Sequence, residues 1–204
     1  MKKILFSLTA IVLSITSFTQ SIITLNQQEK DAILYMREEE KLARDVYEFL
    51  YANWNVNPFG NIRHSEQTHM DRMKALIISY KLTDPVELNN DKRGFFKNSV
   101  LQSYYTELTT TGSSSLTKAL KVGAKIEELD IADLEDRIML TTQPDIINTY
   151  KYLKAASENH LNAFVRCLKV QGVTYEPVIL SKDVFDKIIA SGSSRSGQNR
   201  GRPN

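Results

Sequence analysis

Residues 61–80 place a glutamate and a histidine on one otherwise apolar face of a predicted helix. The members of this face recur at alternating steps of four and three: Ile62, Glu66, His69, Met73, Leu76 and Tyr80. This spacing keeps side chains on one side of a helix, so Glu66 and His69 should point into a core. A charged group there must be paired, hydrogen-bonded or bound to a metal ion, because an isolated buried charge is costly or shifts its pKa.

Three other predicted helices also carry polar residues in the middle of an apolar face. These residues are Glu40 or Glu39 in 27–54, Glu127 and Asp130 in 116–139, and Ser157 and His160 in 144–170. Carboxylates and imidazoles that converge in a helical core are a ligand set for iron, manganese or zinc. The sequence therefore predicts a metal site with the ligands Glu40, Glu66, His69, Glu127 and His160. Further candidates are Glu39, Asp130, Ser157 and Glu158.

The helices that must position these residues have clear boundaries in the sequence. The first, 27–54, contains neither Gly nor Pro and has Asn26 as a cap with Glu29 three residues later. Pro144 suits the first turn of the fourth helix, and Gly172 follows its end. No segment has the alternating pattern of a strand. We therefore predict an all-α fold in which four long helices pack as an antiparallel bundle.

The segments between and after the long helices are shorter and richer in turn residues. Residues 81–98 contain Pro85 and Gly94 and should form a connection, followed by a short helix over 100–110. Such a long link between the second and third long helices suits a bundle with a crossover. A closing segment, 175–180, and a last helical turn, 181–190, follow the fourth helix.

Several polar or reactive residues outside the predicted ligand set have simpler interpretations. Glu38 and Lys41 should lie on the surface, and His64 lies off the face that carries Glu66, so it should face solvent or support a ligand. Tyr47 and Tyr150 should fill the core or hydrogen-bond a ligand carboxylate. Cys167 is better read as a small buried apolar residue than as a ligand.

The two ends of the chain differ from its body in composition. Residues 1–20 have two lysines followed by an apolar run and a small polar stretch, which is the anatomy of a secretory signal peptide. The body, 25–190, is mildly acidic, which argues against a nucleic-acid-binding core. The last segment, 191–204, is rich in Gly, Ser and Arg and should be a disordered basic tail. We expect export to the periplasm or the extracellular space, with no membrane span after the leader is cleaved.

Four blocks of sequence together resemble a known group of proteins. Glu40, Ala43 and Tyr47 fit the first-helix pattern E-x-x-A-x-x-x-Y of the ferritin and rubrerythrin superfamily, and Glu66 with His69 fits the second-helix pattern Glu-x-x-His. The blocks REEEKLARDVY, NIRHSEQTH, GAKIEELDIADL and SENHLNAF resemble an uncharacterised ferritin-like domain family of bacteria and archaea. The resemblance spans roughly 28–189. It implies a ferritin-like four-helix bundle with a metal site, and it brings no established reaction.

The fourth helix departs from the pattern of dimetal bundles, which carry Glu-x-x-His in two helices. Here Ser157 takes the place of the glutamate that should precede His160. Glu158 is one residue out of phase, about 100° around the helix, and would need a distorted turn to reach the same cavity. Asp130, one turn from Glu127, could supply the missing carboxylate. A mononuclear or an asymmetric dinuclear site is therefore as consistent with the sequence as a symmetric one.

The leading functional hypothesis is an exported protein that binds iron or manganese and performs oxidoreductase chemistry on oxygen, peroxide or the metal itself. Zinc would also suit the ligand set. One alternative is a module in which the ion is purely structural, and another is a metal-free helical domain that binds a partner protein or forms a homodimer. Hydrolysis by an activated serine and phosphate binding by a glycine-rich loop are not supported, because neither motif is present.

Overall fold

The computed structural model describes residues 24–198, of which 193–198 are described by their backbone alone. All regular structure within this range is helical and no strand occurs in it, which confirms the predicted all-α class. The elements are α1 (Gln27–Trp54), α2 (Phe59–Ser79), the 3-10 helix η1 (Glu87–Asn89), α3 (Ser99–Ser113), α4 (Leu116–Met139), α5 (Pro144–Val170) and α6 (Lys182–Gln198). The predicted leader, 1–20, lies outside the described residues.

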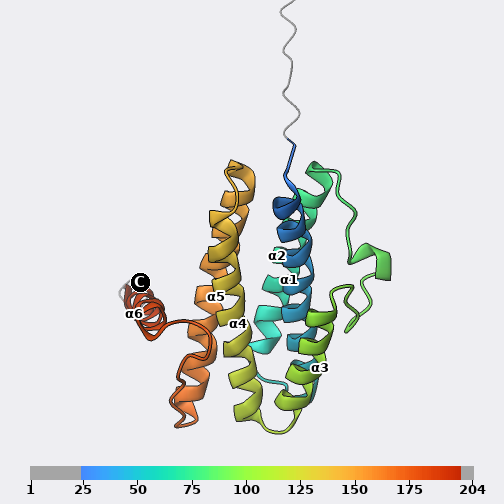
Figure 1. Ribbon diagram of the computed structural model, residues 1–204. Coiled ribbons are helices and arrows are strands. Elements are labelled where there is room, and N and C mark those ends of the chain that lie inside the picture. The colour runs from blue at the N-terminus through green and yellow to red at the C-terminus, as the bar shows by residue number, and fades with distance from the viewer. Residues whose placement is uncertain (1–23, 199–204) are drawn as a thin grey trace, which may run out of the picture.

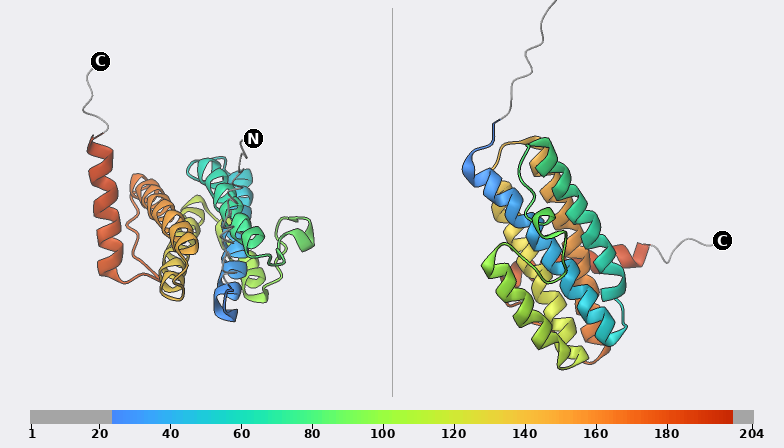
Figure 2. Two further views of the ribbon diagram at one scale, coloured as in Figure 1. Left: turned by 90° about the horizontal axis from the view of Figure 1, so that it is seen from above. Right: turned by 90° about the vertical axis from the view of Figure 1, so that its right-hand side faces the viewer.

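The four long helices lie side by side in two pairs (Figure 1). Helix α1 packs along α2, and α4 packs along α5, while α1 also contacts α4 and α2 contacts α5. The short helix α3 lies against α1 and α4, and α6 stands outside this body against α5 (Figure 2). Among the described residues, no helix combines the length and the apolar character that crossing a bilayer requires.

Local signals in the sequence explain where the long helices begin and end. Asn26 and Glu29 form a complete capping box at the start of α1, and Asn55 ends this helix in the left-handed conformation. The side chain of Ser115 accepts a hydrogen bond from the backbone of Lys118 at the start of α4. Helix α5 begins at Pro144, as predicted. Because these caps are local, α1, α4 and α5 have the predicted boundaries.

The apolar core is divided into two clusters by a layer of polar side chains. One cluster contains Tyr47, Phe59 and Phe164, and the other contains Met36 and Met73. On each long helix the candidate ligands lie in sequence between residues of the two clusters, so the four polar positions meet at one level. The helices approach closely near this layer, because a Cβ at Gly123 would lie only 2.3 Å from the Phe164 ring. The polar layer therefore lies between two apolar clusters.

The expectation that Glu38 and Lys41 lie on the surface is wrong. Lys41 is 0% exposed, and its ammonium group pairs with Asp45 and donates to the carbonyl of Lys92 at 2.9 Å. Glu38 accepts hydrogen bonds from the backbone N–H groups of Lys97 and Asn98 at 2.5 and 3.2 Å. The long connection between α2 and α3 folds over this side of α1 and buries both residues. Their charges fix the connection to the bundle, a tertiary effect that helix periodicity does not encode.

The closing segment after α5 is attached in a similar way by one buried carboxylate. Glu128 on α4 accepts hydrogen bonds from the Tyr175 hydroxyl at 2.6 Å and from the backbone N–H groups of Val178, Ile179 and Leu180. A carboxylate that accepts several N–H and O–H donors is stable inside a protein. The segment leads into α6, which continues to Gln198 and so passes beyond Ala190, where the sequence predicts its end.

Candidate metal centre

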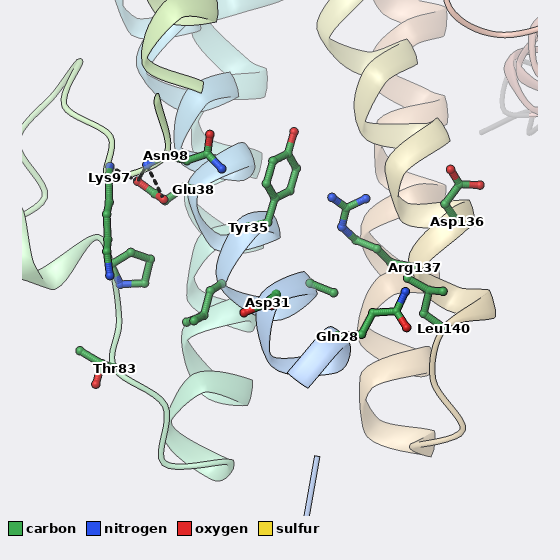
Figure 3. Close-up of a pocket in the computed structure, with 13 residues that line it drawn as sticks. Gln28, Asp31, Tyr35, Glu38, Thr83, Lys97, Asn98, Asp136, Arg137 and Leu140 are labelled. Carbon is green, nitrogen blue, oxygen red and sulfur yellow. Dashed lines mark hydrogen bonds between the residues drawn. The ribbon is translucent and has the colours of Figure 1, made fainter. Parts of the chain in front are cut away.

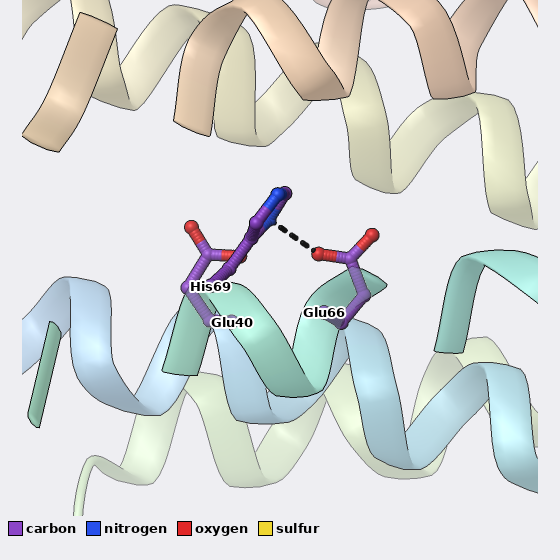
Figure 4. A group of neighbouring side chains, drawn as sticks. All are labelled: Glu40, Glu66 and His69. Atoms are coloured by element: carbon purple, nitrogen blue, oxygen red, sulfur yellow. Dashed lines mark hydrogen bonds and ion pairs between the residues drawn. The ribbon is translucent and has the colours of Figure 1, made fainter. Parts of the chain in front are cut away.

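The polar layer brings all five predicted ligands together from four helices. Glu40 comes from α1, Glu66 and His69 from α2, Glu127 from α4 and His160 from α5. Figure 4 shows the side chains of Glu40, Glu66 and His69 converging above α1 and α2. They form two triads, Glu40–Glu66–His69 and Glu66–Glu127–His160, and within each triad one ligand atom per residue lies within 4.8 Å of the others. Glu66 belongs to both triads.

The two histidines approach opposite oxygens of the shared glutamate. Nδ1 of His69 is 2.8 Å from Oε2 of Glu66, and Nδ1 of His160 is 2.9 Å from Oε1. The second carboxylate of each triad is also close, with Glu40 Oε2 at 3.1 Å from His69 and Glu127 Oε2 at 3.4 Å from His160. The two imidazole rings stack with centroids 5.6 Å apart. Glu66 therefore offers one oxygen to each of the two imidazoles.

These distances suit metal ligands as well as hydrogen bonds. Ligand atoms about 2.1 Å from one ion and at right angles to each other are about 3 Å apart. Several atoms of the layer are buried without a hydrogen-bond partner, among them Glu40 Oε1, His69 Nε2 and Asp130 Oδ1. Buried polar atoms in proteins are almost always satisfied, so a cluster of exceptions indicates a missing ligand. The donor set and its unpaired atoms thus fit a divalent cation.

The environment perturbs the acid–base behaviour of every one of these groups. Burial alone would lower the pKa of His69, but Glu66 and Glu40 raise it to about 12; Glu66 and Glu127 likewise outweigh burial at His160 and raise its pKa to about 10. Burial raises the pKa of Glu40 to about 7 against the opposing effect of His69. At Glu66 the two imidazoles outweigh burial and hold the pKa well below its usual range. Without a metal, protons must balance the carboxylates.

The further candidates fall into different surroundings. Ser157 is buried and donates a hydrogen bond to Asp130 Oδ2, so these two residues meet across α4 and α5 beside the triads. Burial raises the pKa of Asp130 well above its usual range, and Glu40 raises it further. Glu158 is only half-buried and lies 3.7 Å from Lys154, away from the layer. Glu39 is buried beside Glu40 but outside both triads.

Aromatic residues surround the candidate ligands. Tyr47 is fully buried and donates a hydrogen bond to Glu127 Oε1 at 2.5 Å, one of the two roles that the sequence suggests for it. The hydroxyl of Tyr150 is buried in the cluster that contains Met36 and Met73, without a hydrogen-bond partner. His64 is exposed, as one interpretation of the sequence has it, and Cys167 is partly buried.

The sequence does not single out Tyr152, which lies at the edge of the site. Its ring meets the His69 ring edge-on at 6.2 Å and carries the Arg72 guanidinium at 3.6 Å. Tyr152 is 45% exposed, so it does not lie on the apolar face by which the sequence identifies buried residues. Tyr152 lies five residues before Ser157, about 140° around the helix, so the spacing of the candidate ligands does not select it either.

Comparison with known proteins places the chain in a family. The model of the family described as "Uncharacterized protein domain (DUF2202)" matches residues 29–192. An uncharacterised protein of Methanocaldococcus jannaschii, MJ0754, is 47% identical over 176 residues, which cover 86% of this chain and 94% of that protein. The crystal structure of the hypothetical protein MJ0754 superposes with a TM-score of 0.80 at 46% identity, covering 82% of this chain and 95% of that one. The chain belongs to the DUF2202 family, whose description states no activity.

The metal-free protein should lose thermal stability as the pH rises from about 5 to about 8. Glu40, His69 and His160 have raised pKa values, so each contributes stability that is complete below its unfolded pKa and lost as the pH rises through its folded pKa. The shift at Glu40 alone corresponds to a fall in Tm of roughly 5 °C or more. Glu66 has a lowered pKa, so the stability that it contributes is lost only when the pH falls below its unfolded pKa.

Thermal melts of chelator-treated protein at pH 5, 6, 7 and 8, each about one unit apart, measure this dependence. The variant Glu40→Gln should show a shallower dependence, because it carries no proton to lose. A Tm that rises over the same interval would contradict the assignment of protonated carboxyls to the centre.

Proposed function

We propose that this DUF2202 protein binds two iron or manganese ions at the polar layer and acts as an oxidoreductase. The observation that carries the proposal is the pair of triads that share Glu66, each with one imidazole and two carboxylates. A carboxylate that offers one oxygen to each of two sites is the arrangement of a bridging ligand. Carboxylate and imidazole donors suit iron and manganese, and they accept zinc as well.

A ferritin-like bundle is the architecture that we propose for the four long helices. In dimetal bundles, two helices each give one Glu and the other two give Glu-x-x-His. Here α1 and α4 offer Glu40 and Glu127, and α2 offers Glu66 with His69. The pairing of α1 with α2 and of α4 with α5 supports this architecture, as does the long link that joins the pairs.

The missing glutamate of α5 has a substitute on α4. Ser157 occupies the glutamate position and donates to Asp130, which has one buried oxygen without a partner. We propose that Asp130 completes the carboxylate set from the neighbouring helix, with Ser157 fixing its orientation. The centre would then be dinuclear but asymmetric, because its fourth carboxylate comes from α4 and not from α5.

Iron or manganese at this site would supply the one-electron redox chemistry that no side chain of the layer provides. The protein's part is to hold the donors and to keep the site nearly dry, since all five ligands except His160 are almost completely buried. The side chain of His160 is 12% exposed and so leaves a small opening to solvent. Tyr152 and Arg72 border the other imidazole. Oxygen or peroxide is small enough to suit such an opening as the substrate.

The composition of residues 1–20 supports export of the mature protein by the secretory route to the periplasm or beyond. An exported metalloprotein would be loaded outside the cytoplasm or before its release. Oxygen and peroxide chemistry is compatible with either location.

A structural metal site is the second candidate function, and the burial of the ligands favours it. A closed coordination shell would stabilise the fold without turnover. Oxygen consumption after addition of iron(II) distinguishes the two, because only an open coordination position permits reaction with oxygen.

The mature protein, purified without chelator and loaded anaerobically, should bind about two equivalents of iron or manganese. The double variant Glu66→Ala/His69→Ala should lose both, because it removes the bridge and one imidazole. Elemental analysis after desalting gives the stoichiometry. The matched control is His64→Ala/Glu158→Ala, which removes one His and one Glu outside the triads and should keep full binding. Failure of the wild-type protein to retain any metal would contradict the proposal.

Moving the fourth carboxylate between helices should preserve metal binding. Asp130→Ser alone should weaken the second equivalent by about 10-fold or more, because a carboxylate is lost beside the centre. Adding Ser157→Glu should restore the affinity by returning a carboxylate to the same space from α5. Competition titrations with a chromogenic chelator measure both changes. Equal affinity in the wild type and in Asp130→Ser would exclude Asp130 from the ligand set.

A further inference from the structure

Glu39 on α1 is a buried carboxylate for which neither the fold nor the two triads gives a reason. It is 2% exposed, and neither of its oxygens has a hydrogen-bond partner. The charged groups around it are Asp133 and Asp130 on α4, which raise its pKa together with burial, and Arg137, which opposes them. An ionised carboxylate without a partner costs free energy in the interior, so Glu39 must be protonated there or meet a cation.

A groove opens to solvent on the same side of the molecule. It has a volume of about 670 Å³ and lies between α1, α4 and the connection that follows α2. Figure 3 shows Tyr35 of α1 and Arg137 of α4 extending towards each other across it. The guanidinium of Arg137 lies 4.4 Å from the centre of the Tyr35 ring and 3.4 Å from Asp133. Together these two side chains stand between the groove and the buried acids.

The acids behind this pair continue inward to the metal centre. On α4 they are Asp133, Asp130 and Glu127, spaced by three residues. Each step of three moves about 4.5 Å along a helix and about 60° around it, so the series winds from the groove side to the core. Asp133 is partly exposed, whereas Asp130 and Glu127 are buried. Glu39 faces this series from α1, one turn beyond Tyr35.

We propose that this series is the route by which divalent cations travel from the groove to the buried centre, with Asp133 and Glu39 as transient ligands on the way and Asp130 at its inner end. The proposal rests on the proposed metal-binding function. Its basis is the groove that Arg137 lines, the contact of Arg137 with the partly exposed Asp133, and the unpartnered oxygens of Glu39 and Asp130. Carboxylate oxygens can replace the water that a hydrated cation must shed, one step at a time.

Arg137 acts as the gate of this route. Its positive charge lies over Asp133 and partly compensates the acids while no cation is present. Its Nε is buried without a partner, so the guanidinium is not fixed by a complete set of hydrogen bonds. A cation can pass when the side chain turns away towards the groove, where solvent replaces its contacts.

The test is the rate at which cobalt(II) enters the metal-free protein, followed by stopped-flow absorbance under anaerobic conditions. Glu39→Gln keeps the shape of the side chain and should slow loading by about 10-fold or more, since an amide cannot release a proton and bind the cation as a carboxylate does. Its final stoichiometry should equal that of the wild type. Asp133→Asn should also slow loading, and it should disturb the fold less because Asp133 lies nearer the surface. Arg137→Ala should not slow loading. Circular dichroism confirms that each variant is folded.

Glu135→Gln is the matched control, because it removes an exposed carboxylate of α4 that pairs with Lys154 and does not line the groove. It should load at the wild-type rate. If Glu39→Gln and Asp133→Asn both load cobalt(II) at the wild-type rate, the proposed route is wrong. If Tyr152→Ala is the only variant that changes the rate, and it loads faster, the cation enters at the α2–α5 side and the route is also wrong. Loss of a whole equivalent in Glu39→Gln would make Glu39 a permanent ligand and also overturn it. Absence of cobalt binding in the wild type would remove the proposed function itself.

Discussion

The structure depends on placing a layer of carboxylates in the middle of a helical core. Glu40, Glu66, Glu127 and Asp130 are almost completely buried, and only two imidazoles lie among them. Burying unbalanced charge is costly, so these groups must take up protons or a cation. The two apolar clusters on either side supply the favourable burial that holds the four helices together despite this cost. The layer is therefore the least stable part of the core without a cation and the part that a cation would stabilise most.

Other buried charges in the same protein have complete sets of partners. Lys41 pairs with Asp45, Arg37 pairs with Asp84 at 3.1 Å, and Glu128 accepts hydrogen bonds from four donors of the closing segment. These groups fix loops to helices and are fully satisfied, as structural charges usually are. The unpaired carboxylate oxygens and the two unpaired ring nitrogens are concentrated in the polar layer and at Glu39 next to it, with Arg137 and Tyr150 as the further cases among the described residues. This contrast separates groups that build the fold from the groups to which we assign a metal ion.

Much of this arrangement could be predicted from the sequence, because the signals were local. Helix boundaries followed from caps such as Asn26 and Pro144, and the meeting of Glu66 with His160 followed from helix periodicity. The burial of Lys41 could not be predicted, since it depends on a connection that begins some 40 residues later in the chain and covers it. The sequence also could not show that Glu40 belongs to a triad and Glu39 does not. Adjacent residues differ by about 100° around a helix, and only the packing of α1 against α4 decides which of them enters a triad.

Anomalous diffraction from crystals of the manganese-loaded protein locates the bound ions. We expect two peaks in the polar layer, one within the Glu40–Glu66–His69 triad and one within the Glu66–Glu127–His160 triad, with Glu66 between them. A single peak that contacts only one triad would contradict the shared-glutamate arrangement. Peaks at surface carboxylates with none in the layer would contradict the assignment of a metal centre.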